Sequence, residues 1–420
     1  MAFQQALSGL SAASQALDVI GNNVANSATV GFKSAQAHFS DVFANSLSGS
    51  GAAQVGIGVA VAAVQQQFTQ GNVTTTNNPM DIAINGGGFF RMDTNGAISY
   101  TRNGQFHLDK SGYIVNDQSA KLTGYSVDAN GTVVASSPAD LQISSAALSP
   151  VATGQSGSTS AGVLVNVNLD SRSTAPTVTT FDPTNPLSYT YSTPVSVYDS
   201  LGNAHTLTLY AVDTPPSPAT VPPTGVWAIN ATVDGTVSPL TTVPSTLTFD
   251  SSGKLTGTGV LGASLALTNG AVSPLVFNIN FTGSTQFGST STTNSLVQDG
   301  YTSGSLTGIG VGADGIVQGN YSNGEARKLG QVVLANFADP NGLSSLGNNQ
   351  WAETSVSGAA LVGAPNSGRF GVLQASAIEE SNVDLTAELV NMITAQRNYQ
   401  ASAQTIKTQD AIMQTLVNLR

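Results

Sequence analysis

The feature that most constrains this chain is a heptad pattern of apolar residues near its C-terminus, between Leu385 and Leu419. Apolar side chains recur there at alternating steps of four and three positions, and the segment has no glycine or proline. The pattern therefore predicts one long amphipathic helix. Glu388 near its start and Arg420 at its end complement the helix dipole. A helix with so long an apolar stripe needs a partner to cover it.

Residues 1–26 carry a second stripe with the same spacing, and they too are predicted to form an amphipathic helix. The two stripes together are called the predicted assembly stripe. Its members are Phe3, Leu7, Leu10, Leu17, Val24, Leu385, Leu389, Met392, Tyr399, Ile406, Met413 and Val417.

Two interpretations of these stripes are open. The helices could pair with each other as an antiparallel coil within a monomer, which spacing alone favours. Alternatively, the stripes are covered only by copies of the chain. We favour the second interpretation, because glycine-rich connectors separate both helices from the rest of the chain and the N-terminal helix has few large side chains. We therefore expect both ends to be disordered in the isolated chain and to become ordered on assembly.

The composition excludes several classes of function. Only 9% of the residues are charged and the net charge is -11, with 13 Lys and Arg, so no nucleic-acid-binding face is expected. The absence of cysteine excludes thiol catalysis and disulfides. No basic segment precedes Asp18, and no apolar run reaches the roughly 18 residues of a membrane helix. We expect neither a cleavable signal peptide nor a membrane span.

The middle of the chain is predicted to be all β. Short strand-like segments are separated by Asp-x-x-Gly turns such as Asp93–Gly96 and Asp250–Gly253. Most of the 17 prolines lie between Pro150 and Pro274, which indicates an inserted domain.

The predicted fold is thus mainly β with α-helical termini, in which two nested β-domains are built on a coiled-coil domain of terminal helices. The expected boundaries are 1–30 and 380–420 for the helices, 31–71 and 355–379 for the connectors, 72–144 and 286–354 for the first β-domain, and 145–285 for the inserted outer β-domain.

No segment has the pattern of a catalytic, cofactor or metal site. Gly257–Gly262 fits GxGxxG, but a dinucleotide site needs this motif between a strand and a helix, and strand-like residues follow it here. His38, His107 and His205 are scattered, and none has a partner at metal-ligand or catalytic spacing. We therefore predict no catalytic residue, no cofactor and no metal, and expect a protein that is not an enzyme.

Three sets of motifs resemble the bacterial flagellar rod and hook proteins. They are Ser8–Ser14, Asp18–Asn26 and Thr29–Lys33 near the N-terminus, Asn78–Ile84, Gly88–Phe90 and Tyr100–Phe106 in the β-region, and Glu380–Leu385, Glu388–Ile393 and Gln396–Gln400 near the C-terminus. The positions that match the family's terminal motifs are Gly21, Asn22, Asn23, Asn26, Gly31, Phe32, Asn382, Asp384, Asn398 and Tyr399.

Within this family, Val195–His205, Gly319–Asn323 and the large insert resemble the hook subunits. The resemblance implies a homopolymer, a curved flexible tube that acts as a universal joint and transmits motor torque to the filament, with the terminal helices in its inner layer. It also implies location in the hook and basal body at the cell exterior, and export by the flagellar export apparatus. Rod, hook-cap and hook–filament junction proteins are the implied partners. Two alternatives stay open: a distal rod component, which lacks a large insert, and a secreted β-rich glycan-binding protein or enzyme.

Overall fold

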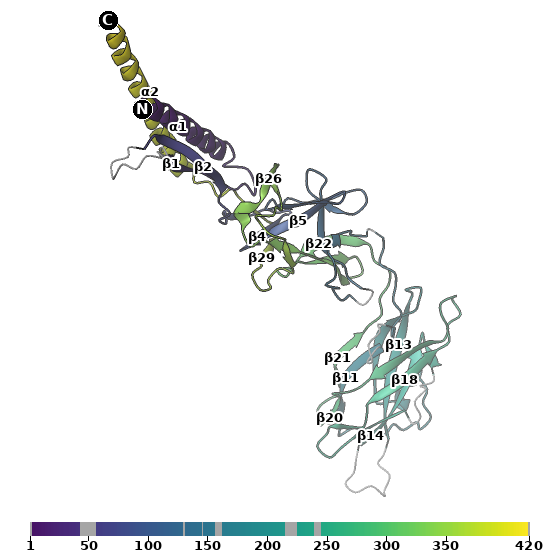
Figure 1. Ribbon diagram of the computed structural model, residues 1–420. Coiled ribbons are helices and arrows are strands. Elements are labelled where there is room, and N and C mark those ends of the chain that lie inside the picture. Colours follow the sequence, from purple (N-terminus) through teal and green to yellow (C-terminus); the bar gives the residue numbers. More distant parts are fainter. Residues whose placement is uncertain are drawn as a thin grey trace. The chain divides into compact units, whose positions relative to one another are not determined.

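The computed structural model describes residues 2–42, 56–128, 131–144, 146–155, 162–214, 225–238 and 245–418. The chain divides into two units, and the second is inserted into the first (Figure 1). The first unit consists of Met1–Ser144, Gly308–Gly319 and Arg327–Arg420, and the second of Ser145–Thr307 and Asn320–Ala326. Both are rich in strands, and helices occur at the two ends of the chain. The predicted fold class is confirmed.

The terminal helices α1 (Ala2–Ala25) and α2 (Leu385–Asn418) pack against each other in antiparallel directions. Gly9 lies opposite Ser402, since a Cβ at Gly9 would be 3.2 Å from the Ser402 Oγ atom. Further along, Asn23 Nδ2 donates a hydrogen bond of 3.0 Å to Glu388 Oε1. This pairing corrects our expectation that the ends are disordered in the isolated chain. The small side chains of α1, such as Gly9, let the two helices approach closely.

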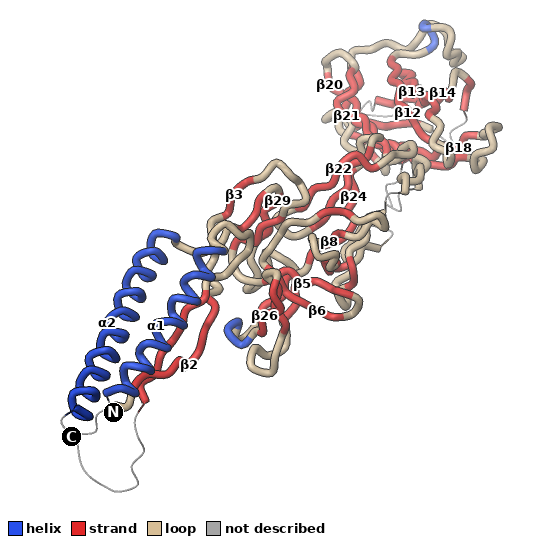
Figure 2. Tube along the Cα trace, turned by 90° about the horizontal axis from the view of Figure 1, so that it is seen from above, coloured by secondary structure: helices blue, strands red, loops and turns tan. Residues whose placement is uncertain are grey.

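A two-stranded antiparallel ribbon covers another side of α1. It consists of β1 (Ala35–Val42) and β2 (Gly58–Gln66), and α1 lies between this ribbon and α2 (Figure 2). Val59 N donates to the Ser8 hydroxyl (3.3 Å), and the Gln5 side chain donates to the Gly56 carbonyl. As a result α1 is covered on two sides, whereas α2 has a neighbour on one side and is the more exposed helix.

A 13-stranded sheet forms the body of the first unit, with the central order β22-β23-β24-β9-β5-β6-β27-β26. Its strands are β5 (Phe89–Thr94), β6 (Ala97–Thr101), β7 (His107–Leu108), β8 (Ile114–Val115), β9 (Lys121–Tyr125), β10 (Ala139–Asp140), β22 (Leu306–Val311), β23 (Ile316–Tyr321), β24 (Ala326–Val332), β25 (Leu334–Asn336), β26 (Ser344–Gly347), β27 (Gln350–Ala352) and β28 (Leu361–Gly363). Aromatic side chains meeting edge to face, Phe89, Tyr100, Phe337 and Trp351, form part of its core.

Two short strand pairs and a 3-10 turn complete the first unit. The strand β3 (Val73–Thr75) pairs with β30 (Ala377–Glu379), and β4 (Ile82–Asn85) pairs with β29 (Val372–Ala375). The turn η2 covers Pro340–Gly342. Each strand pair joins a segment that follows α1 to a segment that precedes α2, so the two ends of the chain enter the helix pair side by side.

The second unit contains two sheets that share one core. One sheet holds β11 (Gly162–Asp170), β18 (Val260–Leu265), β19 (Leu275–Asn280), β20 (Thr285–Phe287) and β21 (Thr292–Gln298). The other holds β12 (Tyr191–Tyr198), β13 (Ala204–Thr214), β14 (Gly225–Val233), β15 (Thr236–Ser238), β16 (Thr246–Phe249) and β17 (Leu255–Thr256), and the turn η1 (Pro186–Ser188) precedes β12. Buried side chains of both sheets, among them Val165, Leu207 and Trp227, form a single cluster.

The last strands of this unit differ from the expected domain boundary. The insert was expected to end at residue 285, whereas β20 and β21 both pair with β11 and the unit continues to Thr307. The predicted Asp-x-x-Gly turns are present: Gly96 N donates to Asp93 Oδ1, and Ser252 N donates to Asp250 Oδ1 (2.9 Å). Gly96 and Gly253 have φ angles of 91° and 78°, which explains the glycines.

Candidate functional site

Large apolar side chains remain exposed on the paired terminal helices. Among the described residues there are nine of them, and Phe3 and Leu7 are half exposed at 49% and 50%. We call this set the helix-pair apolar surface. Its members are Phe3, Leu7, Leu385, Leu389, Val390, Ile393, Tyr399, Ile412 and Met413. Exposed apolar side chains that gather on one part of a protein are a mark of interaction sites.

Small residues form the contact between α1 and α2. Ala6, Ala13 and Ala395 are buried, and Gly9 faces Ser402. The buried apolar residues of the two helices are thus small, whereas their large apolar side chains are exposed or only partly covered. Full burial of an exposed Leu, Ile or Phe side chain contributes about 1.5–3 kcal/mol, and these half-exposed side chains forgo part of that free energy. The pair is therefore able to form within one molecule and still presents apolar area to another.

The predicted assembly stripe divides between this surface and partly covered positions. Six members are exposed: Phe3, Leu7, Leu385, Leu389, Tyr399 and Met413. Five are partly covered: Leu10, Leu17, Val24, Met392 and Ile406. The Val417 side chain lies outside the described residues. Three exposed residues were missed, namely Val390, Ile393 and Ile412. Ile393 follows Leu389 by four positions, so an ordinary helical period could have found it. Val390 and Ile412 follow no apolar member of the set at a step of three or four, and this period does not mark them.

The end of α2 extends beyond α1. Because Gly9 lies opposite Ser402 and the helices are antiparallel, Ala2 at the start of α1 reaches about as far as Gln409. The last turns of α2 project past the N-terminus of the chain (Figure 1). Ile412 and Met413 are exposed in this projecting part.

The family-motif residues next to the helices connect them to the ribbon. Asn23, which is 1% exposed, donates to the Ala35 carbonyl (2.8 Å) and accepts from the Ala35 amide (2.9 Å). In the same way, Asn382 accepts from Ser34 N (2.7 Å) and donates to the Gln67 carbonyl (2.7 Å). These amides satisfy backbone groups at one end of the ribbon, where β1 begins and β2 ends.

The start of α2 is fixed by a capping side chain. Asp384 Oδ1 accepts hydrogen bonds from Thr386 N (2.9 Å) and Ala387 N (3.1 Å), the geometry of a helix N-cap. At the end of α1, Asn26 Nδ2 donates to the Asn22 carbonyl (2.9 Å). These contacts define where each helix begins or ends.

The remaining motif residues differ from one another in burial and contacts. Gly31 has a φ of 70°, and a Cβ there would lie 2.6 Å from Asn103 N, so only glycine fits. Phe32 is partly buried, whereas Asn398 and Tyr399 are exposed on α2. No atom lies within 4 Å of a Cβ built on Gly21, and nothing in the structure explains a glycine there.

A buried charge cluster at the base of the helix pair was not predicted. Lys33 Nζ lies 2.6 Å from Glu379 Oε1, and Arg102 Nη1 lies 3.0 Å from Glu379 Oε2. All three side chains are almost fully buried. Burial lowers the pKa of Lys33 and of Arg102, and the Glu379 carboxylate offsets part of this effect. The signal was their place in the sequence, since Lys33 and Arg102 lie inside the recognised motifs and Glu379 directly precedes one.

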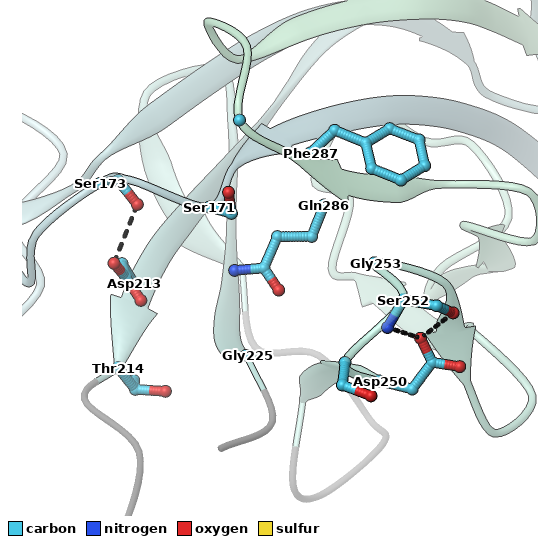
Figure 3. A pocket seen from close by; sticks show the side chains of 12 residues that line it. Ser171, Ser173, Asp213, Thr214, Gly225, Asp250, Ser252, Gly253, Gln286 and Phe287 are labelled. Carbon is cyan, nitrogen blue, oxygen red and sulfur yellow. Dashed lines mark hydrogen bonds between the residues drawn. The ribbon is translucent and has the colours of Figure 1, made fainter. Parts of the chain in front are cut away.

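The second unit has a polar hollow of about 470 Å³ (Figure 3). Ser173 Oγ donates to Asp213 Oδ2 (2.9 Å), and Asp250 accepts from the Ser252 hydroxyl (2.6 Å), so each carboxylate is bound by a neighbouring serine. Burial raises the pKa of Asp213. The described lining contains no His, Lys or Arg, and we assign no chemistry to it.

His205 has partners that sequence reasoning did not find. Its Nδ1 lies 2.7 Å from Asp234 Oδ2, and its Nε2 lies 3.3 Å from Asp199 Oδ2. Both ring nitrogens are thus engaged by carboxylates on opposite sides of the ring. Within the part of the chain that the structure describes, no three His, Asp or Glu side chains are grouped to hold a metal ion.

Four family models match successive parts of the chain. They are described as flagella basal body rod protein (residues 3–33), flagellar hook protein FlgE/F/G D1 domain (83–175), flagellar basal body protein FlaE D2 domain (168–301) and flagellar basal body rod FlgEFG protein C-terminal (374–419). The flagellar hook protein FlgE of Salmonella typhimurium is 44% identical over 428 residues, covering 100% of both chains. The chain belongs to the flagellar hook protein family.

Other members of the hook protein family agree with this assignment. The FlgE of Escherichia coli K12 is 43% identical over the full length of both chains, and that of Borreliella burgdorferi is 31% identical over 99% of this chain and 98% of its own. The crystal structure of Helicobacter pylori FlgE2 shares the fold, with a TM-score of 0.53 at 14% identity over 73% of this chain and 100% of that chain. Searching the described residues finds no helix with the length and apolarity needed to span a membrane.

Proposed function

We propose that this chain is a structural subunit of the bacterial flagellar hook and polymerises through its terminal helices into a tube. The observation that carries the proposal is the helix-pair apolar surface, which one molecule leaves uncovered. The full-length identity to proteins named flagellar hook protein supports the same conclusion. Their match across the second unit favours a hook subunit over a distal rod component.

Assembly would add the burial that the isolated pair lacks. Covering an exposed Leu389 or Ile393 contributes up to about 1.5–3 kcal/mol per side chain, against which the loss of rotational and translational freedom must be set. In a tube, each subunit has several neighbours, so many moderate contacts add up. We infer that the terminal helices form the inner layer and that the β-rich parts lie outside it.

The outer layers would meet through polar contacts. Only 9% of the residues are charged, so few ion pairs are available to hold neighbouring subunits in one register. Hydrated Thr, Ser and Asn contacts can be exchanged for others at small free-energy cost. This supports a tube that keeps its inner contacts while it bends, as a universal joint between motor and filament must.

The proposal also covers the partners, the export route and the location of the subunit. Its partners would be further copies of the chain, the rod, the hook cap and the hook–filament junction proteins. We infer export through the flagellar export apparatus to the cell exterior. We expect no enzymatic activity, because the family is structural and the described carboxylates of the polar hollow are bound by serines.

Electron microscopy of the purified full-length chain tests the proposal. Raising the protein concentration should produce tubes of uniform diameter, since the apolar surface is then covered by copies. A variant that lacks residues 385–420 should stay monomeric at the same concentration while it retains its β-sheet circular dichroism. A full-length chain that remains a compact monomer, or a truncated one that forms normal tubes, would contradict the proposal.

A further inference from the structure

The base of the helix pair is joined to the sheet of the first unit through one carboxylate. Glu379 ends β30 and lies between the connector after α1, which supplies Lys33, and the turn after β6, which supplies Arg102. Its Oε1 atom also accepts from Gly71 N (2.9 Å), and its carbonyl accepts from Gly31 N (2.8 Å). Glu379 therefore contacts three segments that are far apart in the sequence, namely residues 31–33, Gly71 and Arg102.

The two cations have further fixed partners. Lys33 Nζ donates to the Thr69 carbonyl (2.7 Å), and Arg102 Nη2 donates to the Gly86 carbonyl (2.9 Å). The Arg102 guanidinium also lies 5.3 Å from the centre of the Phe89 ring, in the core of the first unit. Each charge is thus held from two directions at least, and the cluster carries one positive charge in excess.

Stability alone does not explain such a cluster. Removing three ionised groups from water is costly, and well-packed apolar residues of similar volume often give equal or greater stability. Charge-assisted hydrogen bonds, in contrast, depend on direction, so they permit one arrangement of the segments where an apolar contact permits several. A cluster of this kind is therefore suited to fixing the orientation of the segments that it joins.

The backbone around the cluster leaves no space for adjustment. A Cβ on Gly31 would collide with the backbone of Asn103, and one on Gly71 would collide with the Glu380 carbonyl. Asn349 Nδ2 adds a hydrogen bond of 2.9 Å to the Val30 carbonyl. The connector after α1 is therefore seated directly on the turns of the sheet.

We propose that Glu379 is a positioning residue, and that its contacts with Lys33 and Arg102 hold the terminal helix pair in the one orientation on the first unit that is competent for assembly. This inference rests on the proposed hook function. It adds that this cluster makes the connection between the helix pair and the sheet rigid. Torque applied to the inner layer would then be transmitted to the β-rich layer.

Spin-label distances in the full-length chain test this inference, and the absence of native cysteine makes the labelling specific. Labels on Gln404→Cys of α2 and Gln118→Cys of the sheet, both exposed, should give one narrow distance distribution. The variant Glu379→Gln leaves two buried cations without a counter-charge and should lose the narrow peak. The matched control Lys121→Met with Asp140→Asn removes a partly exposed ion pair of the same unit and should keep it.

A second variant separates positioning from folding. The triple substitution of Lys33, Arg102 and Glu379 by Met keeps the volume and removes the charges. We expect it to unfold at a temperature similar to that of the unaltered chain, yet to lose both the narrow distance peak and regular tubes. A folded triple variant that keeps the peak and forms normal tubes would overturn the inference. Failure of the unaltered chain to form tubes would instead count against the proposed function.

Discussion

The second unit and the terminal helix pair place their large apolar side chains in opposite ways. In the second unit, Trp227, Phe249 and Leu207 are fully buried between two sheets, and one cluster gathers apolar residues from both. In the helix pair, the buried apolar residues are alanines, and Leu389, Ile393 and Met413 are about half exposed. The comparison teaches that the second unit has a complete core of its own, whereas the helix pair folds with only part of its apolar area covered.

The largest expected effect is on tube formation and concerns the exposed side chains of the helix pair. Leu389→Asp combined with Ile393→Asp places two charges on the helix-pair apolar surface, and desolvating them at an interface would abolish tube formation. Sedimentation velocity should show monomers at concentrations where the unaltered chain sediments as polymer. Thr405→Asp, an exposed change on another side of the same helix, is the control. Normal polymer from the double variant would exclude this surface as a subunit contact.

The next effect concerns the second unit. Trp227→Ala leaves a cavity in a filled core and should lower the free energy of unfolding of that unit by about 3–5 kcal/mol. Leu389→Ala, on the exposed side of α2, should change monomer stability by no more than about 0.5 kcal/mol. Urea unfolding of both variants measures the difference. Equal losses would show that the helix pair has a core as complete as that of the sheets.

A smaller effect is expected at the start of α2. Asp384→Ala removes the side chain that accepts from Thr386 N and Ala387 N, and should cost about 1 kcal/mol of helix stability. Amide hydrogen exchange in the first turn of α2 should become faster, while exchange in the second unit stays unchanged. Asp384→Asn, which keeps a capping oxygen, should restore most of the protection.

The smallest effect is a pH dependence confined to the second unit. Burial disfavours charged His205, but hydrogen bonds with Asp234 and Asp199 outweigh it and raise the pKa of His205. Burial likewise opposes ionisation of Asp199 and Asp234, yet their hydrogen bonds lower the pKa of each. The histidine contribution is complete below about pH 6.5 and is lost as the pH rises through the raised pKa. The carboxylate contributions are present above about pH 4 and are lost in acid.

Thermal unfolding followed through Trp227, in a Trp351→Phe background, should therefore give the highest midpoint between about pH 4 and 6.5. His205→Gln should remove the decline on the alkaline side. A midpoint that rises from pH 6.5 to 9 in the unaltered chain would contradict the assignment of His205 as a charged partner of the two carboxylates.

The sequence predicted those parts of the structure that depend on local patterns. The heptad spacing found α2 and its first residue, and the Asp-x-x-Gly turns found hairpins, because helix period and turn chemistry act over a few residues. The predicted domain boundary at residue 285 differs from the structure because β21 pairs with β11, and these strands are more than 100 residues apart in the sequence. No local pattern encodes such a pairing.

The candidate site was predicted less completely than the fold. Heptad counting selected Leu389 but not Val390 or Ile393. It follows one strict stripe along the helix, and exposed apolar residues also lie outside that stripe. The cluster of Lys33, Arg102 and Glu379 depends on contacts between three distant segments. Few residues of this chain are charged, but the sequence does not show which of them are buried. The cluster could therefore be found only from the folded structure.

Electron cryomicroscopy of tubes grown from the full-length chain tests the central claim most directly. The account predicts that the side chains of Leu389, Val390 and Ile393 are covered by helices of neighbouring copies in the inner layer of the tube. Tubes in which these side chains still face water, with the subunits held together through the second unit alone, would contradict it.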